Sequence, residues 1–303
     1  MANDRRDVER RQSRCRLLTH TSGLTRKGPL MGTHKARSWF VVPGDRPERF
    51  DEPVANGAHA VILDLEDLVG PAKKDAARRA VARWLTEHQA YVRINAVDTE
   101  WYEDDLAAVA GAPGLQGVVL PKADGSAPIE RTASALPAAV PVLPLVETAA
   151  GLQNASAVAA TPRVAALIFG SLDFGLDLGI DVRAGQDDVN LLYARSRLVI
   201  ASRAAGIAPP IDGVTTDLDD PGVAAADAGR ARHLGFGGKL CIEPRQIDAV
   251  NGAFAPSEGD LDWARRVLAA IDGADGEVMV RLDGQLIDRP VISRAQQLLG
   301  TAR

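Results

Sequence analysis

Short apolar runs separated by amphipathic segments repeat along most of the chain, from residue 38 to about residue 254. A continuous apolar run is typical of a strand that is buried on both faces of a parallel sheet. The segments between the runs carry the spacing of apolar residues that favours helices. The predicted strands span residues 39–43, 60–65, 91–95, 117–122, 141–147, 164–170, 210–214 and 237–242.

Helices are predicted after each strand. Gly206 is suited to end one of them, and Asp219 or Asp220 is suited to cap the next. Pro71 is suited to the first turn of another. One predicted helix follows the turn at Gly44, and another follows the fourth strand and ends near residue 136. The other predicted helices span residues 71–88, 101–110, 188–205, 220–234, 246–253 and 258–271.

Alternating strands and helices predict an α/β fold with a parallel sheet, and eight such units predict a closed (β/α)8 TIM barrel. The alternative is a doubly wound open sheet. Such a sheet usually begins with a glycine-rich phosphate turn, and the turn at Gly44 lacks the GxGxxG pattern. The barrel is therefore the favoured architecture, over residues 37–272.

Residues 273–303 form a predicted extension with no place in the layers of a barrel. Strand alternation around Asp283-Gly284 predicts a hairpin over 277–290, and Pro290 opens a helix to about residue 299. Its apolar side chains need cover, and we expect the extension to pack on a neighbouring subunit. These side chains are Leu282, Leu286, Ile287, Val291, Ile292, Leu298 and Leu299.

Composition narrows the class of protein. The 303 residues are 46% hydrophobic and 25% charged, which suits a large folded domain. A formal charge of -5 argues against nucleic acid as the main partner. Cys15 and Cys241 cannot form a disulfide framework, and Cys241 lies in an apolar run, as expected of a buried thiol in a reducing cytoplasm. The sequence shows no membrane-length apolar run and no signal peptide.

Residues 1–36 differ from the rest because basic side chains dominate and no periodicity is sustained. The segment could be a basic arm for anionic partners. It could equally be a solvated, poorly ordered tail, or a stretch included by start-codon choice.

Polar residues gather where the predicted strands end, at the face of a barrel that carries active sites. Any one of them alone could be a helix cap or a surface ion pair. A ring of them indicates a functional site. The ring comprises Asp64, Glu66, Asp67, Arg93, Asn95, Lys122, Glu147, Asp173, Thr215 to Asp217 and Glu243.

Glu147 and Asp173 end two consecutive runs, so adjacent parallel strands would bring their carboxylates to one point. Two carboxylates with substrate oxygens and water suit Mg²⁺, which rarely has an all-protein cage. Several carboxylates at one mouth repel each other unless a cation, Arg93 or Lys122 neutralises them. We therefore expect a magnesium site, with substrate contacts from Arg93, Glu66, Asp67, Lys122 and Glu147.

An ordered set of motifs resembles the HpcH/HpaI aldolase and citrate lyase β-subunit family over about residues 37–302. Each motif alone is weak, but all of them occur in the family's order. They are Ser38-Trp-Phe-Val-Val-Pro-Gly44, Val61-Ile-Leu-Asp-Leu-Glu-Asp67, Val92-Arg-Ile-Asn95, Val119-Leu-Pro-Lys122, Leu145-Val-Glu-Thr148, Phe169-Gly-Ser-Leu-Asp173, Leu192-Tyr-Ala-Arg195, Gly235-Phe-Gly-Gly-Lys239 and Gly284-Gln-Leu-Ile-Asp-Arg-Pro290.

The resemblance implies a barrel lyase that breaks or forms a carbon–carbon bond in a 3-hydroxyacyl-CoA thioester with Mg²⁺. Malyl-, citramalyl- or citryl-CoA would be typical substrates, with acetyl-CoA and a keto acid as products. The family's metal ligands fall on Glu147 and Asp173, and its substrate-binding arginine falls on Arg93. Its catalytic aspartate, supplied by a neighbouring subunit's tail, falls on Asp288. A homotrimer or hexamer with shared active sites is implied.

Several points stay open on the residues themselves. Asp288 could be only a turn residue before Pro290. At the position of Val41 the family commonly has an aromatic residue. After the eighth strand it commonly has His-Pro, where this chain has Glu243-Pro244. Glu243 could cap the next helix or tune the substrate.

The phosphates of CoA need cations, and candidates lie just after the first two strands. These are Arg46, Arg49 and Lys73, which could equally be solvated charges on helix faces. Two other functions remain: the β subunit of a multi-subunit citrate lyase, acting on an acyl-carrier-protein thioester, and a non-catalytic barrel that serves as a binding partner.

Overall fold

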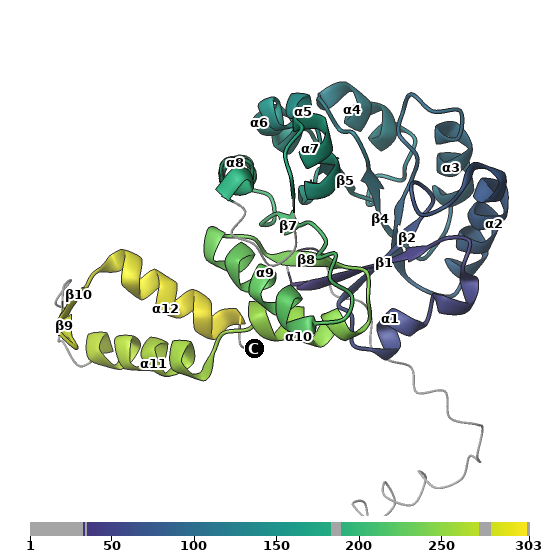
Figure 1. Ribbon diagram of the computed structural model, residues 1–303. Helices are drawn as coiled ribbons and strands as arrows, with labels where there is room; N and C mark the ends of the chain where they lie inside the picture. The colour runs from purple at the N-terminus through teal and green to yellow at the C-terminus, as the bar shows by residue number, and fades with distance from the viewer. Residues whose placement is uncertain (1–32, 34, 183–188, 273–279, 302–303) are drawn as a thin grey trace, which may run out of the picture.

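Eight parallel strands close into a barrel in sequence order, as predicted (Figure 1). The computed structural model describes residues 33, 35–182, 189–272 and 280–301, so almost all of the basic segment 1–36, Cys15, Asp188 and residues 277–279 lie outside it. β1 pairs with both β2 and β8, which closes the ring. The strands are β1 (Ser38–Pro43), β2 (Ala60–Asp64), β3 (Ala90–Arg93), β4 (Leu115–Leu120), β5 (Val142–Val146), β6 (Ile168–Phe169), β7 (Ile211–Asp212) and β8 (Gly238–Cys241).

Helices surround the barrel (Figure 1). Gly206 ends α8 with a φ of 71°, and the Asp220 carboxylate caps α9 by accepting a hydrogen bond from the Gly222 amide at 2.7 Å, so both predicted caps are confirmed. The helices are α1 (Glu52–Ala55), α2 (Lys74–Trp84), α3 (Tyr102–Val109), α4 (Ser126–Ser134), α5 (Ala149–Gln153), α6 (Ala155–Ala160), α7 (Ser171–Leu178), α8 (Val189–Ala205), α9 (Pro221–Leu234) and α10 (Arg245–Phe254).

Some elements are shorter than the apolar pattern predicts. β6 and β7 hold two residues each, and Val164 makes only an isolated bridge to Val142. The predicted helix 71–88 divides into a 3-10 turn, η2 (Pro71–Lys73), and α2. The residues after Gly44 likewise form η1 (Pro47–Arg49) before α1. Proline stands at the first turn of η1, α1 and η2, where its missing N–H has no cost.

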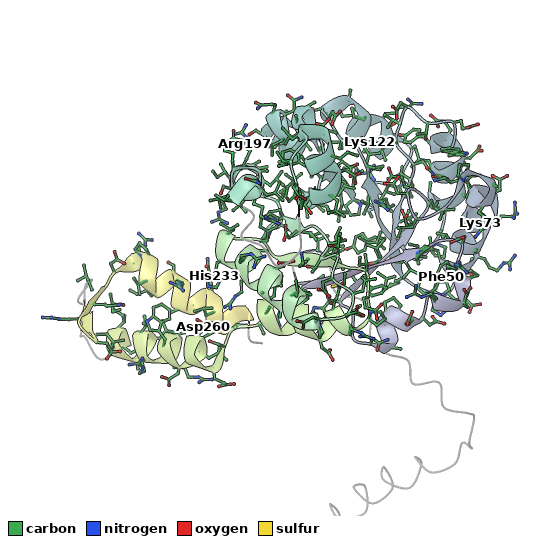
Figure 2. The ribbon with its side chains drawn as sticks, viewed as in Figure 1. Phe50, Lys73, Lys122, Arg197, His233 and Asp260 are labelled. Carbon is green, nitrogen blue, oxygen red and sulfur yellow. The ribbon has the colours of Figure 1, made fainter. Side chains whose placement is uncertain are left out.

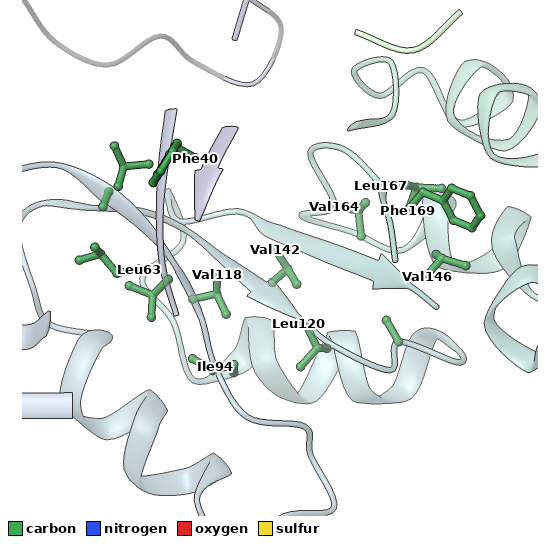
Figure 3. Close-up of a cluster of buried hydrophobic side chains, with 14 of the residues drawn as sticks. Phe40, Leu63, Ile94, Val118, Leu120, Val142, Val146, Val164, Leu167 and Phe169 are labelled. Carbon is green, nitrogen blue, oxygen red and sulfur yellow. The ribbon is translucent and has the colours of Figure 1, made fainter. Parts of the chain in front are cut away.

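Alternate residues of each strand face two different cores. Trp39 and Val41 of β1 point into the barrel, where Trp39 packs against Tyr91 with ring centroids 4.8 Å apart. Phe40 and Val42 point outward, into the layer between the strands and the helices. Figure 3 shows part of this outer cluster, which contains Phe40, Leu63, Val118, Leu120, Val142, Val146 and Phe169. The period of two therefore fixes which residues turn inward at the strand ends.

The chain finishes in an arm of residues 258–301 that projects from one side of the barrel (Figure 1). It consists of α11 (Glu258–Asp272), β9 (Val280–Leu282), β10 (Gln285–Ile287) and α12 (Arg289–Thr301). Asp283 and Gly284 both have positive φ, at 50° and 79°. That is the geometry of a tight two-residue hairpin turn, which confirms the hairpin predicted around Asp-Gly.

The arm has a small core of its own. Ala264 and Val267 of α11 are buried together with Ile287 and Ala295. α11, which the boundary at residue 272 assigns to the barrel, packs instead against α12, because both helices carry an apolar face. Of the apolar side chains expected to need a neighbouring subunit, this cluster contains Leu282, Ile287, Val291, Ile292, Leu298 and Leu299, while Leu286 stays 59% exposed.

The arm and the barrel are joined by an ion pair. Arg232, near the end of α9, donates to the Asp260 carboxylate at 2.9 Å, and Asp260 also accepts from the amide of Ser257 at the start of α11 (Figure 2). Within the part of the chain that the structure describes, no helix is long and apolar enough to cross a membrane.

Candidate active site

Three charged side chains continue the inward-facing rows of the barrel beyond its apolar core. Asp64, Arg93 and Glu147 end β2, end β3 and follow β5, respectively. Each stands two residues after a residue of the inner core, so each turns toward the barrel axis at the rim formed by the strand C-termini. Those inner-core residues are Ile62, Tyr91 and Leu145.

Arg93 is held by Asp64, its register partner on the adjacent strand. Its Nε and Nη2 both donate to the Asp64 carboxylate, the latter at 2.9 Å, and Asp64 also accepts from the amides of Glu66 and Leu68. Burial alone would lower the pKa of Arg93, but the charge and hydrogen bonds of Asp64, with Glu66, raise it above its ordinary value. Asp64 thus keeps a fixed cation at the rim. From the sequence, Asp64 was predicted only to be a polar residue at the end of a strand. The alternation of side chains along β2 and β3 could have shown that Asp64 and Arg93 point to the same side and lie next to each other.

Glu66 extends this charged group. Its carboxylate is buried, and Oε2 lies 3.1 Å from Arg93 Nη1 but has no hydrogen-bonding partner within the described residues. Burial raises the pKa of Glu66 to about 8. The positive charge of Arg93 lowers this pKa, and the negative charges of Asp67, Glu147 and Asp64 raise it further. The buried Glu66 carboxyl therefore keeps its proton more readily than an exposed one.

Glu147 faces the same group from β5. Its Oε1 accepts a hydrogen bond from the Lys122 amide at 2.8 Å. Burial raises the pKa of Glu147 to about 7 despite that hydrogen bond, and the charges of Asp173 and Asp67 add to the rise while Arg93 opposes it. Lys122 contributes its backbone, in the left-handed conformation with φ of 48°, whereas its side chain is exposed.

Asp173 stands in the first turn of α7, directly after β6. The approach of this turn to Glu147 requires glycine at position 170, because a Cβ there would lie 2.5 Å from the Glu147 Cβ and 2.7 Å from its Oε2. On the other side of Glu147, Thr148 caps α5 by accepting from the Gly151 amide at 2.9 Å, and its hydroxyl donates to Asp124. Both flanks of Glu147 are therefore fixed by local structure.

The two carboxylates of Glu147 and Asp173 fit a magnesium ion. No group of three or more His, Cys, Asp or Glu side chains that could hold a metal occurs among the described residues. Mg²⁺ usually binds through one or two carboxylates and keeps several waters. Burial, more than neighbouring charge, raises the pKa of Glu147, and a divalent cation beside it would favour its ionised form.

A pocket of about 440 Å³ opens beside β1 and the loop after β2. Arg46 and Lys73, two of the three cations predicted to hold phosphates, line it, and Lys73 also pairs with Asp45 at 2.8 Å (Figure 2). The third, Arg49, is not among its lining residues and pairs with Glu52 at 2.9 Å. The other lining residues are Pro43, Asp45, Leu68, Gly70, Pro71 and Ala72.

Asp288 is the predicted site residue that this chain does not bring to its own rim. It follows β10, at the end of the arm that lies away from the barrel in Figure 1. Its carboxylate accepts from the Val291 amide at 3.3 Å, as a residue at the start of α12 would. Glu243 stands just before α10, with its amide donating to Gln246 and its carboxylate 3.5 Å from Arg245.

The model of the HpcH/HpaI aldolase/citrate lyase family matches residues 37–244. This chain belongs to that family. The match covers all eight barrel strands. The chain is therefore an enzyme, one of the lyases that resemble the citrate lyase β subunit.

Known relatives and solved structures are similar to this protein over most of its length. A citrate lyase subunit beta-like protein of Deinococcus radiodurans is 37% identical, over 87% of this chain and 96% of its own. A (3S)-malyl-CoA thioesterase of Cereibacter sphaeroides is 32% identical, over 89% and 95%. The crystal structure of CitE from Mycobacterium tuberculosis with magnesium, acetoacetate and coenzyme A has a TM-score of 0.79 and 35% identity, over 89% of this chain and 99% of that one.

Proposed function

We propose that this protein is a Mg²⁺-dependent lyase that cleaves or forms a 3-hydroxyacyl-CoA thioester such as malyl-, citramalyl- or citryl-CoA. The observation that carries the proposal is the grouping of Arg93, Glu66, Glu147 and Asp173 at the barrel rim, with several carboxylates beside one fixed guanidinium. The magnesium, acetoacetate and coenzyme A bound by the CitE structure support it.

Glu147 and Asp173 are the residues that would hold the ion. When bound there, Mg²⁺ supplies Lewis-acid polarisation to the keto-acid end of the substrate. Glu66 and Asp67 lie near enough to Glu147 to interact with it electrostatically, so their carboxylates would serve as acceptors in the same space.

Arg93 stabilises the charge that develops when the carbon–carbon bond breaks. In cleavage, the 3-hydroxyl gives its proton to a carboxylate at the rim and becomes a carbonyl, while the electrons of the carbon–carbon bond pass into the enolate of the acetyl thioester. A guanidinium fixed by two hydrogen bonds to Asp64 can face the developing oxyanion without reorganising. The enolate then takes a proton at its terminal carbon and leaves as acetyl-CoA.

Asp288 is our choice for the group that moves this last proton. A carboxylate can donate it in cleavage and remove it in condensation. Because the arm carries Asp288 away from its own barrel, we propose that the arm of a neighbouring subunit supplies it, in a homotrimer or hexamer with shared sites.

The CoA end of the substrate is assigned to the pocket that Arg46 and Lys73 line. Its lining combines apolar surface from Pro43 and Leu68 with two cations. That combination suits an adenine ring and its phosphates.

A thioester screen tests the proposal. The purified protein is incubated with malyl-, citramalyl- and citryl-CoA with and without Mg²⁺, and acetyl-CoA, free CoA and keto acid are measured separately. Formation of acetyl-CoA with an equal amount of keto acid is expected. Free CoA with an intact hydroxy acid would instead indicate hydrolysis, the activity in the name of the Cereibacter relative.

The other two functions predict different results in the same experiment. A subunit of a larger citrate lyase would turn over only a thioester carried on an acyl-carrier protein. A non-catalytic barrel would bind neither Mg²⁺ nor a thioester.

A further inference from the structure

A buried polar network lies directly behind the loop that carries Glu66 and Asp67. At its centre is Lys74, the first residue of α2, which is only 5% exposed. Its ammonium donates to the backbone oxygens of Leu65 at 2.7 Å and Glu66 at 2.8 Å, and to Asn95 Oδ1 at 2.7 Å. An ammonium has three N–H donors, so all of them are used.

The network continues through Asn95 to α3. The Asn95 side-chain amide donates to the Leu65 carbonyl at 2.8 Å and to Asp105 at 2.6 Å, and its backbone amide donates to Asp105 at 2.9 Å. Arg78 of α2 donates to the other Asp105 oxygen at 3.0 Å. Asn95 and Asp105 are 2% and 1% exposed. Buried polar networks of this kind hold their members in one arrangement.

The loop is consequently held from both sides. The Asp64 carboxylate accepts from the amides of Glu66 and Leu68, while Lys74 takes the carbonyls of Leu65 and Glu66. Both peptide groups of Glu66 are therefore anchored. Its side-chain Oε2, by contrast, is buried without a hydrogen bond. The ion pair with Arg93 Nη1 at 3.1 Å is its described polar contact, so the direction of the carboxylate depends on where the anchored backbone of the loop holds it.

We propose that Lys74 is a positioning residue which, with Asn95 and Asp105, fixes the loop 65–67 so that the Glu66 carboxylate faces the reacting end of the substrate. This inference rests on the proposed function. The Lys74 ammonium binds the loop backbone and Asn95 and lies over the Trp101 ring, 4.9 Å from its centroid. Lys74 therefore acts through Glu66 and not on the substrate.

The alternative is that Lys74 only stabilises the fold, and a double-mutant cycle separates the two roles. Lys74→Met removes the ammonium at similar volume, Glu66→Gln removes the carboxylate, and the double variant completes the cycle. Two quantities are measured: kcat with KM for the thioester, and the Mg²⁺-dependent affinity for acetoacetate by calorimetry.

We expect Lys74→Met to lower kcat and the acetoacetate affinity by about 10- to 100-fold, because a displacement of about 1 Å in a group that faces the substrate can cost about 100-fold. KM for the CoA thioester should stay within a few-fold, because the pocket at Arg46 and Lys73 does not involve the network. In the Glu66→Gln background the same substitution should cost little, since there is no carboxylate left to position. Fully additive costs would overturn the proposal.

Two further variants guard against simple unfolding. Lys74→Arg keeps the cation, should give an intermediate loss, and replaces Lys74→Met in the cycle if the latter does not fold. Arg163→Met is the matched control. Arg163 also donates to backbone carbonyls, but it does so between α4 and β6, at the opposite end of the barrel.

Arg163→Met should lower the melting temperature and leave acetoacetate affinity unchanged. An equal loss of affinity in Arg163→Met and Lys74→Met would show general destabilisation and overturn the positioning role. A wild-type protein that neither turns over thioesters nor binds acetoacetate would instead overturn the proposed function, and the role of Glu66 with it. Wild-type behaviour of Lys74→Met in an active enzyme overturns the positioning role alone.

Discussion

The barrel rim and the C-terminal arm are built on opposite principles. At the rim, Asp64, Glu66 and Glu147 are almost completely buried, and they share one guanidinium. In the arm, the polar side chains are mostly exposed, and a small apolar core holds two helices and a hairpin together. The rim has several carboxylates for one guanidinium, whereas Asp288, the proposed catalytic carboxylate, lies on the arm and away from the rim of its own chain.

This difference indicates how the two regions would cooperate. A rim with several buried carboxylates can bind a cation and the keto-acid end of a substrate, but the described helices of the arm project away from the rim of their own chain. An arm that folds on its own core can move or exchange as a unit without disturbing the barrel. The first two predictions test whether these roles can be separated.

The largest effect is expected at the metal-holding carboxylates. Glu147→Ala and Asp173→Ala should each abolish Mg²⁺-dependent turnover, because each removes one of the two oxygen donors of the proposed site. Both residues lie outside the packed layers of the barrel, so the fold should persist. Isothermal titration measures Mg²⁺ affinity, and far-UV circular dichroism shows whether the fold persists. Unchanged Mg²⁺ affinity in both variants would show that Glu147 and Asp173 are not the metal ligands.

Loss of the arm should abolish activity by a different route. Deleting residues 258–303, not only 273–303, avoids leaving the apolar face of α11 uncovered. The truncated protein should bind Mg²⁺ normally, assemble less, and lack turnover. Asp288→Ala alone should lose turnover with assembly intact. Size-exclusion chromatography with light scattering and titration calorimetry provide the measurements.

A mixing experiment decides whether the arm acts on its own barrel. Asp288→Ala and Glu147→Ala are each inactive alone, but mixed oligomers can pair an intact barrel with an intact arm. Some activity should return after subunit exchange. If co-assembled proteins stay inactive, Asp288 works within its own chain or has no catalytic role.

A smaller but still large effect is expected at Arg93. Arg93→Lys keeps the charge but loses the planar pair of hydrogen bonds to Asp64. Turnover should fall by about 10²–10³, the usual cost of one oxyanion donor. Steady-state kinetics measure this, with Arg49→Lys as a control arginine that pairs only with Glu52 in the same part of the chain. A value within a few-fold of wild type would reduce Arg93 to a structural ion-pair partner.

The comparison also explains what the sequence could predict. The rim residues follow from the strand pattern, because parallel strands end on one face and side chains alternate with a period of two. Asp64, Arg93 and Glu147 were identifiable in this way. The Asp-Gly hairpin was identifiable too, since its turn chemistry is local.

Other features depend on contacts between distant segments. Nothing local in Lys74 shows that its ammonium reaches back to the Leu65 and Glu66 carbonyls. The same holds for α11, whose apolar face suits either the barrel or α12. Arg46 and Lys73, unlike Arg49, line one pocket, because the loops after β1 and β2 meet there.

The smallest predicted effect concerns pH and involves the rim alone. Burial raises the pKa of Glu66 to about 8 and of Glu147 to about 7, from an ordinary value of 4.5. Between about pH 4.5 and 8 the folded protein therefore binds more protons than the unfolded chain. Its free energy of unfolding should fall as pH rises through that window, because the unfolded chain releases these protons near pH 4.5 while the folded protein still holds them.

This trend can be checked by denaturant unfolding without Mg²⁺ at several pH values. Glu66→Gln should flatten it, because an amide has no proton to lose, whereas Glu52→Gln at the surface should not. Saturating Mg²⁺ should also reduce the slope, since a bound cation favours the ionised carboxylates and stabilises the folded state most at high pH. An arm-deleted protein should show the same dependence between pH 4.5 and 8, because Glu66 and Glu147 both belong to the barrel. Arg232 lowers the pKa of Asp260, in the arm, to about 2, so the stability that Asp260 contributes is lost only below this window. If deletion of the arm removes the trend, the two regions are coupled more closely than their separate cores indicate.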